Sequence, residues 1–361
     1  MLEGSAMARK GRMKSSLPPP LSANIIPIMS QRLQNRIATS RLALPLTLLY
    51  AMAAWAGRLV DNPHLWPSLI LFCVATYLVI ELNNRNALMR QYSRMMSCSY
   101  IAMMTMCGWL LADVRVMTFQ VCVIAAFTLI FMSYQRRDDM GHCFWAYLFI
   151  GLAAFLWPPV LMLVPVFWIG ESSYLMSFSL RAFLASIIGV VTPFWIALPV
   201  VFYTGEYEMA TDFLRAFVPG EAFLSMADTP SALLALPSDL KPCTLLSVLL
   251  VVLMMLIGIV HFFRQSYRDK IHVRMLYQFF TLSAIVLLAA LCAILFLPFD
   301  DTPAASYILS AIIFCASPFV AHYVTFTSSR LSGVTTITLI LAIIALTAIQ
   351  YIPSIAPYIS G

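Results

Sequence analysis

Residues 243–263 read CTLLSVLLVVLMMLIGIVHFF, 21 residues without Asp, Glu, Lys or Arg. A helix needs about 20 such residues to cross a hydrocarbon core about 30 Å thick. The densest basic loop of the chain, Arg264–Arg274, follows this run, and a long connection with six acidic residues, about 205–242, precedes it. Loops rich in Lys and Arg stay on the cytoplasmic side of a membrane. The stretch therefore predicts a transmembrane helix whose C-terminal end lies on the cytoplasmic side.

Ten further apolar runs lie along the chain, at about 42–57, 66–82, 95–112, 116–133, 143–157, 159–170, 182–204, 275–297, 305–323 and 334–352. The alternating segments of outer-membrane barrels are missing. We therefore expect an all-α, polytopic transmembrane helical bundle of about 11 spans, with a cytoplasmic N-terminus and an extracytoplasmic C-terminus. Two runs are short because they meet at Trp157-Pro158-Pro159, where Pro ends a helix. They form either two spans or one re-entrant hairpin.

The charges of the loops test this topology. Outside the N-terminal tail, the predicted cytoplasmic side carries Arg85, Arg90, Arg94, Arg136, Arg137, Arg181, Arg264, Arg268, Lys270, Arg274 and Arg330. The predicted extracytoplasmic side carries only Arg58, Arg115, Arg215 and Lys241. This asymmetry is typical of a multi-pass protein of the cytoplasmic (inner) membrane. It explains the net charge of +6 without a nucleic-acid partner, so that membrane lipids are the predicted partners.

The composition and the domain boundaries agree with this topology. Hydrophobic residues make up 61% of the chain and charged residues 11%, whereas soluble domains carry about 25% charged residues. Residues 1–41 form a basic cytoplasmic tail that we expect to be disordered, and residues 42–361 form a single transmembrane helical domain. The connection at about 205–242 is an extracytoplasmic loop. Within it, Met209 and Phe213 recur at helical spacing and predict an amphipathic helix at the membrane interface.

The candidate site residues lie in the first two extracytoplasmic loops. Asp61 and Asp113 are the candidate catalytic residues, because a carboxylate beside a membrane suits a general base for a lipid-linked substrate. Arg58, His64 and Arg115 are the candidate substrate-binding residues, because Arg binds phosphate well. The alternative interpretation of the same residues is a set of solvated loop caps.

Other kinds of site have less support in the sequence. We predict no metal site and no cofactor, because His64 lies outside, whereas His142, His261, His272 and His322 lie near cytoplasmic ends and no pair has the i, i+4 spacing of a helical metal motif. Gln120 is the most polar side chain well inside a span and predicts a hydrogen bond between helices. Pro193 and Pro318 either kink their helices or break them around a cavity.

From Tyr134 the chain reads YQRRDDMGHCFWAYLFIGLAAFLWPPVLMLVPVFWIGE and, after a short polar turn, LRAFLASIIGVVTPFWIALP up to Pro199. This stretch resembles an uncharacterised bacterial family of multi-pass membrane proteins, which implies architecture but no activity. A weaker likeness is to polytopic glycosyltransferases that use polyprenyl-phosphate-linked sugars. That likeness implies Asp61 as the catalytic carboxylate and a polyprenyl-phosphate-linked substrate as a partner. The paired acidic residues that many of those enzymes have in the first outer loop are absent here.

Three functions follow from these observations. The first is a role in the assembly of cell-envelope glycans or lipid-linked intermediates at the extracytoplasmic face, and it is the one we favour. The second is a transporter or flippase for a neutral or amphipathic substrate, although no span carries a charge at its centre. The third is a structural or assembly subunit of a membrane complex. The sequence leaves open whether the protein is an enzyme.

Overall fold

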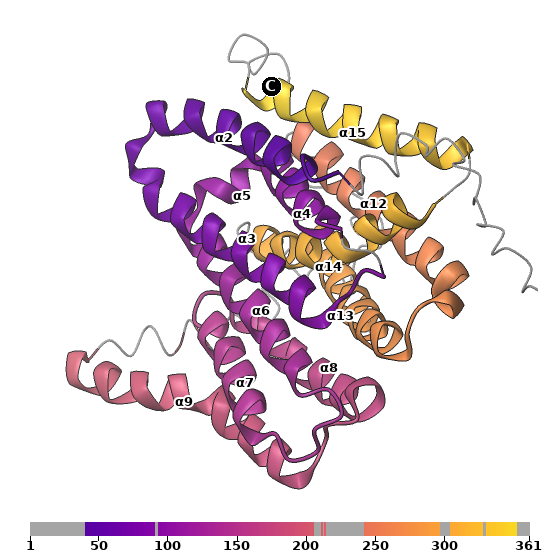
Figure 1. Ribbon diagram of the computed structural model, residues 1–361. Helices are drawn as coiled ribbons and strands as arrows, with labels where there is room; N and C mark the ends of the chain where they lie inside the picture. Colours follow the sequence, from indigo (N-terminus) through magenta and orange to yellow (C-terminus); the bar gives the residue numbers. More distant parts are fainter. Residues whose placement is uncertain are drawn as a thin grey trace, which may run out of the picture.

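The computed structural model describes residues 40–90, 93–205, 211, 213, 242–296, 304–327 and 330–351. Within these residues the chain is helical and contains no strand (Figure 1). The fold class is therefore an all-α bundle, as predicted. Most of the predicted tail, 1–41, and of the predicted loop, 205–242, lies outside the described residues.

The first half of the chain forms α2 (Ala43–Asp61), η1 (Pro63–Leu65), α3 (Trp66–Asn86), α4 (Met95–Met106), α5 (Gly108–Ala112), α6 (Val114–Met132), α7 (Met140–Ala154), η2 (Pro158–Met162), α8 (Leu163–Gly170) and a π-helical turn, η3 (Glu171–Leu175). The second half forms α9 (Leu180–Thr204), α12 (Pro242–Gln265), η5 (Ser266–Arg268), α13 (Ile271–Phe296), α14 (Ala304–Phe326) and α15 (Arg330–Tyr351).

Eight of the described helices are long and apolar enough to cross a membrane, namely α2, α3, α6, α9, α12, α13, α14 and α15. The remaining predicted spans fall on shorter elements: α4 with α5, α7, and η2 with α8. Helix thus covers most of the described residues of every predicted apolar run. The chain is a multi-pass membrane protein.

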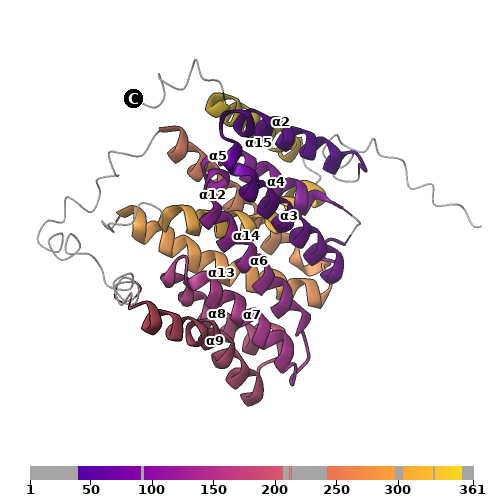
Figure 2. The ribbon, with the colours of Figure 1, turned by 90° about the vertical axis from the view of Figure 1, so that its left-hand side faces the viewer.

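The helices lie in layers. Figures 1 and 2 show α2 and α15 on one side, α7, α8 and α9 on the opposite side, and α6, α13 and α14 between them. The middle layer is the core, where Phe127 of α6 stacks on Phe280 at 5.5 Å between ring centroids and meets Phe314 edge-on at 5.2 Å. Gln120 of α6 donates a hydrogen bond of 3.1 Å to the carbonyl of Ser310 on α14, which confirms the predicted bond between helices.

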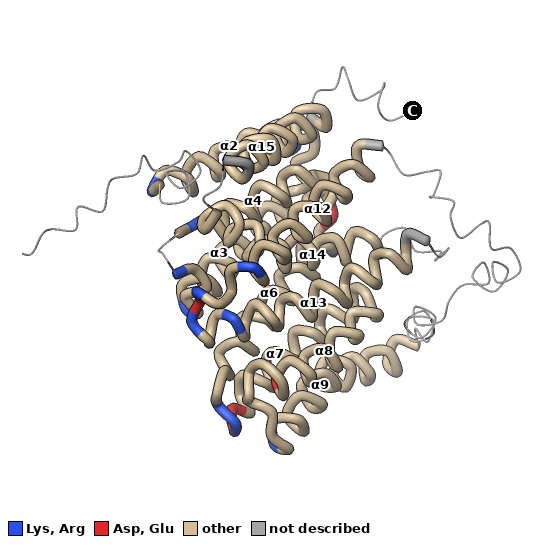
Figure 3. Tube along the Cα trace, turned by 90° about the vertical axis from the view of Figure 1, so that its right-hand side faces the viewer, with Lys and Arg blue, Asp and Glu red and all other residues tan. Residues whose placement is uncertain are grey.

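The helix ends that the topology assigns to one side meet in the structure. Arg90, after α3, donates to the carbonyl of Arg268, after α12, at 3.3 Å. The rings of Tyr134, after α6, and His272, in the first turn of α13, lie 4.3 Å apart. Figure 3 shows most Lys and Arg residues along one edge of the molecule. We call this edge the basic end and the opposite edge the outer end.

The pair of short spans crosses from one end to the other. Trp157, between α7 and η2, packs on Phe119 at 6.1 Å and on Tyr307 at 6.5 Å between ring centroids, near the outer ends of α6 and α14. At the basic end, the backbone N–H of Gln135 donates to the carbonyl of Leu175 at 2.9 Å. The geometry favours two short crossings over a shallow re-entrant hairpin.

The prolines within α9 and α14 do not break these helices. Both helices run through, past Pro193 and Pro318. Pro318 has no N–H for the carbonyl of Phe314, and the hydroxyl of Ser317 donates to that carbonyl at 2.8 Å instead. On the facing helix, Ser99 donates to the carbonyl of Ser317 at 2.9 Å. The backbone carbonyl groups around Pro318 are therefore satisfied by side chains.

Candidate functional site

The site residues predicted from the first outer loop lie at the outer end of the bundle. Arg58, in the last turn of α2, donates a hydrogen bond to the carbonyl of Gly108, where α5 begins. Asp61 is the last residue of α2, and His64 is exposed in the 3-10 turn that follows. The structure thus brings the end of α2 to the second outer loop through Arg58.

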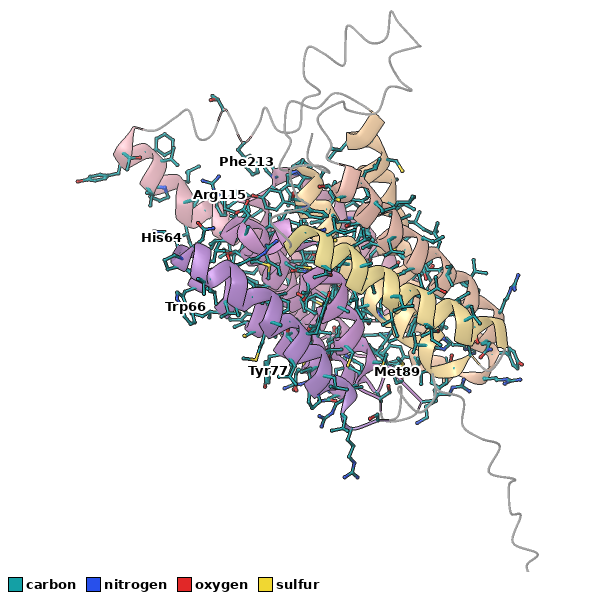
Figure 4. All side chains as sticks on the ribbon, turned by 90° about the horizontal axis from the view of Figure 1, so that it is seen from above. His64, Trp66, Tyr77, Met89, Arg115 and Phe213 are labelled. Carbon is teal, nitrogen blue, oxygen red and sulfur yellow. The ribbon has the colours of Figure 1, made fainter. Side chains whose placement is uncertain are left out.

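Asp113 and Arg115, from the second outer loop, act at the start of α6. The carboxylate of Asp113 accepts a hydrogen bond of 2.8 Å from the backbone N–H of Arg115 and caps this helix. A cap satisfies an N–H group that has no partner inside the helix. Arg115 is exposed, and Figure 4 shows it at the same end as His64, opposite Met89. Capping accounts for Asp113, and a catalytic role for Asp61 or Asp113 stays a prediction.

A second group of ionisable residues meets at the basic end. Nε2 of His322, on α14, lies 3.2 Å from Oδ2 of Asp269, which follows η5. Nδ1 of His322 lies 3.3 Å from Nδ1 of His261, on α12. Nε of Arg90 lies 2.7 Å from Oδ1 of Asp269, an ion pair whose N–H is not aligned for a hydrogen bond. We call Arg90, Asp269, His322 and His261 the basic-end cluster.

The basic-end cluster is buried. The side chains of His322 and Asp269 are 0% and 1% exposed, and His261 is 9% exposed as a residue. The side chain of Arg90 is 28% exposed and reaches in from the surface. A buried carboxylate is costly unless it has partners. Asp269 has Arg90 beside one oxygen and His322 beside the other.

Local packing explains why the two imidazoles face each other. A Cβ atom on Gly258 of α12 would lie 2.8 Å from the backbone of Phe319 on α14, so this glycine lets the two helices approach closely. One turn further along each helix come His261 and His322. Close approach at Gly258 therefore sets the distance between the imidazoles.

Aromatic rings enclose the cluster. Tyr277 of α13 stacks on Phe262 at 4.5 Å between ring centroids, and its hydroxyl donates to the carbonyl of Pro318 at 3.1 Å. The guanidinium of Arg90 lies over the ring of Phe326 at 4.4 Å, close enough for a cation–π contact. These contacts hold the side chains of the cluster in place and exclude water from Asp269.

A pocket of about 440 Å³ opens beside His261, between α12, α14 and α15. Part of its lining is apolar and comes from Leu256, Ile257 and Val260 on α12. The other lining residues are polar: His261, Arg264, Tyr323, Thr327, Ser332 and Thr335. Arg264 is exposed at the end of α12, so the polar part of the pocket lies toward the basic end. The pocket suits a ligand with an apolar chain and a polar head.

The contacts assign the protons of the cluster when both imidazoles are neutral. The carboxylate of Asp269 only accepts, so Nε2 of His322 donates to it. Nδ1 of His322 then accepts, and Nδ1 of His261 donates to it. Nε2 of His261 keeps a lone pair, and among the described residues it has no hydrogen-bond partner. The His261 side chain lines the pocket, but this nitrogen is itself buried.

Glu171 is a second buried carboxyl group at the basic end, in the π-helical turn after α8. The thiol of Cys143 donates to its Oε1 at 3.4 Å, and its Oε2 has no hydrogen-bond partner among the described residues. Burial raises the pKa of the Glu171 carboxyl to about 7, and the contact with Cys143 only partly offsets this rise. In contrast to Asp269, Glu171 forms no ion pair within the described part of the chain.

The sequence places His261 and His322 near the same membrane face, but their spacing does not join them as ligands along one helix. Asp269 lies in the basic loop Arg264–Arg274, where nothing in the sequence separates it from an ordinary loop charge. The available signal was that both histidines lie about one turn inside the ends of spans on the same predicted side. Within the described residues, no group of three or more His, Cys, Asp or Glu is arranged to hold a metal ion.

Comparison with known proteins does not assign the chain to a family. No family model, no curated protein and no solved structure matches the chain. Both family resemblances therefore stay predictions, and a functional conclusion has to rest on the geometry of the site.

Proposed function

We propose that the protein binds a lipid-linked phosphate intermediate of cell-envelope assembly in the pocket beside His261 and acts on its head group by acid–base chemistry. The observation that supports this function is the buried chain of contacts from Asp269 through His322 to His261, a residue that also lines an amphipathic pocket. A carboxylate that orients an imidazole is a recurring arrangement in general acid–base catalysis.

The lining of the pocket supports the class of ligand. Leu256 and Val260 offer an apolar wall to a polyprenyl chain, and Arg264 offers a guanidinium to a phosphate. The basic residues at this end attract anionic head groups, each contributing about 1 kcal/mol near a charged leaflet. A phosphate at the membrane surface with its chain in the hydrocarbon fits both parts of the lining.

The proposal keeps the substrate class predicted from the sequence and moves the chemistry to the basic end. At the outer end, Arg58 donates to the carbonyl of Gly108 at the start of α5, and Asp113 caps α6. Chemistry at the extracytoplasmic face, through Asp61 or Asp113, is the competing placement. The transporter alternative drew on helices broken at Pro193 and Pro318, and α9 and α14 run through these positions.

Binding can be measured with the purified protein in nanodiscs of zwitterionic lipid, with polyprenyl phosphate as the ligand and polyprenol as the uncharged control. We expect saturable binding of the phosphate only. Arg264→Gln should weaken it about tenfold, the loss expected for one charge-assisted contact. Arg137→Gln is the matched control, because Arg137 is exposed in the loop after α6 and does not line the pocket. Equal affinity for both lipids, or equal loss in both variants, contradicts the proposal.

A further inference from the structure

We propose that the pocket beside His261 opens sideways into the bilayer, between α12 and α15, and that the lipid-linked phosphate enters it from the leaflet at the basic end. The inference rests on the proposed function and adds the route of the ligand and the place of its chain. It restricts the ligands to lipids that stay in the membrane and excludes phosphates that are dissolved in water.

Three helices form the sides of the pocket. α12 contributes one wall, which includes Leu256 and Val260, and α15 contributes the opposite wall through Ser332 and Thr335. Tyr323 of α14 lies at the floor, and its hydroxyl shares a hydrogen bond with the hydroxyl of Thr335. This bond joins α14 to α15 along the floor of the pocket.

The remaining side of the pocket is open to lipid. Val260 and Leu256 are 52% and 44% exposed, although both line the pocket, and Thr335 on the opposite wall is exposed as well. All three residues lie within helices that are long and apolar enough to cross a membrane, at Cys243–Arg268 and Ser332–Gln350. Exposed surface on such a helix meets hydrocarbon. The mouth of the pocket therefore faces the bilayer.

The two walls meet near the outer end and separate toward the basic end. Nε2 of Gln350, near the end of α15, donates to the hydroxyl of Ser247, near the start of α12, at 3.4 Å. From this contact the two helices diverge, and the pocket lies between them where α12 approaches its end (Figure 1). A lipid in the leaflet at the basic end meets the open part of this wedge, whereas a lipid in the opposite leaflet meets the closed part.

The charge at the basic end sets the position of the ligand. Arg264 lies at the end of α12, and Leu256 lies about two turns earlier, or about 12 Å along the helix axis. A phosphate that pairs with Arg264 therefore places the first part of its chain against Val260 and Leu256. A polyprenyl phosphate brings one chain to this wedge, whereas a phospholipid brings two. We therefore expect the polyprenyl phosphate to be preferred over the bulk lipid.

Photo-crosslinking locates the chain. Benzoylphenylalanine replaces Val260 in the full-length protein, which is placed in nanodiscs of phosphatidylcholine that contain a small share of polyprenyl phosphate, and mass spectrometry identifies the adducts. We expect the share of polyprenyl phosphate among the adducts to exceed its share of the bilayer about tenfold. The matched control replaces Ile196, which is 67% exposed on α9, on the opposite side of the bundle. Its adducts should follow the composition of the bilayer.

Val260→Trp tests the mouth of the pocket by affinity. A larger side chain fills the space that the lipid chain needs, so we expect the affinity for polyprenyl phosphate to fall about tenfold. Leu249→Trp is the matched control. Leu249 lies about three turns before Val260 on the same face of α12, is 60% exposed and does not line the pocket. Its affinity should equal that of the wild type, and an excess of inorganic phosphate in the buffer should compete with the lipid in neither case.

The outcomes distinguish this inference from the function on which it rests. Saturable binding of polyprenyl phosphate together with Val260 adducts that only follow the composition of the bilayer overturns the inference and leaves the proposed function in place. Competition by inorganic phosphate, or equal affinities of Val260→Trp and Leu249→Trp, also overturns it. If polyprenyl phosphate does not bind saturably to the wild-type protein, the proposed function fails and the inference fails with it.

Discussion

The two ends of the helical bundle carry similar polar side chains but use them differently. At the outer end, Asp113 caps a helix, Arg58 binds a backbone carbonyl and His64 is exposed. At the basic end, a carboxylate, a guanidinium and two imidazoles from four separate segments touch one another in a buried cluster. Helix ends need caps in any protein, whereas buried ionisable groups in a membrane protein are costly and mark functional sites. By this difference the basic end is the stronger candidate for the functional site.

The largest effect is expected from Asp269→Asn. This change removes the charge that balances Arg90 and the acceptor that orients His322. Breaking a buried ion pair costs about 3 kcal/mol of unfolding free energy, and loss of an oriented imidazole lowers acid–base catalysis about 100-fold or more. Thermal unfolding in detergent measures the first effect, and the polyprenyl-linked intermediates of a complemented depletion strain report the second. A variant with wild-type stability and a normal profile of intermediates would remove the contrast between the two ends.

A smaller effect is expected from Glu171, the second buried carboxyl group of the basic end, which makes the stability of the protein depend on pH. The pKa of Glu171 is raised to about 7 from an ordinary value of 4.5, so the folded protein holds this proton more tightly than the unfolded chain does. The contribution of Glu171 to the free energy of unfolding is therefore greatest below about pH 4.5. It falls as the pH rises toward 7 and is constant above that. We expect a loss of about 3 kcal/mol of unfolding free energy across this range.

Glu171→Gln should remove this decline, because an amide is neutral at every pH. The measurement is thermal unfolding in detergent between pH 5 and 8, for the variant and the wild type. Glu81→Gln is the control, because it changes a carboxylate that is partly exposed and paired with Arg85. A decline that persists in Glu171→Gln would show that another group is responsible.

Gly258→Ala tests whether helix packing sets the contact between the imidazoles. The new Cβ would lie 2.8 Å from the backbone of Phe319, so α12 and α14 must move apart. Such overpacking costs about 1–3 kcal/mol of unfolding free energy. We also expect the affinity for polyprenyl phosphate to fall about tenfold. In Gly57→Ala, no atom lies within 4 Å of the new Cβ, and the affinity should not change. Equal affinities in the two variants would mean that the close approach at Gly258 has no part in binding.

The smallest effect is expected at the outer end. Asn caps a helix as well as Asp does, so Asp113→Asn should preserve both stability and function. Asp113→Ala removes the cap and should cost about 1 kcal/mol of unfolding free energy, again with function preserved. Thermal unfolding together with complementation of a depleted strain measures this pair. If Asp113→Asn alone abolishes complementation, the carboxylate is catalytic and the outer face carries the chemistry.

The fold could be predicted almost completely from the sequence. Hydrophobic runs long enough to cross a membrane, such as residues 243–263, identify helices because the bilayer demands satisfied backbone groups. The alternation of loop charge then assigns the helix ends to two sides. A hydrogen bond from Gln120 to another helix was expected because a polar group inside a span needs a partner, and the structure shows that this partner is the carbonyl of Ser310.

The site could not be predicted in the same way. Hydropathy identifies each helix but not its neighbours, and His261 and His322 are 61 residues apart in the chain. Their contact depends on the close approach at Gly258, which is a property of packing. The residues chosen from the sequence, such as Asp61 and His64, were neighbours along the chain, and that criterion finds loops more readily than convergent sites.

The most direct test compares the two histidines at opposite ends of the bundle. A strain depleted of the protein is complemented with the wild type, His261→Gln or His64→Gln, and its polyprenyl-linked intermediates are profiled by mass spectrometry. We predict that one defined intermediate accumulates on depletion, that it still accumulates with His261→Gln, and that His64→Gln restores the normal profile. Normal profiles with His261→Gln, or accumulation with His64→Gln alone, would contradict the conclusion that function lies at the basic end.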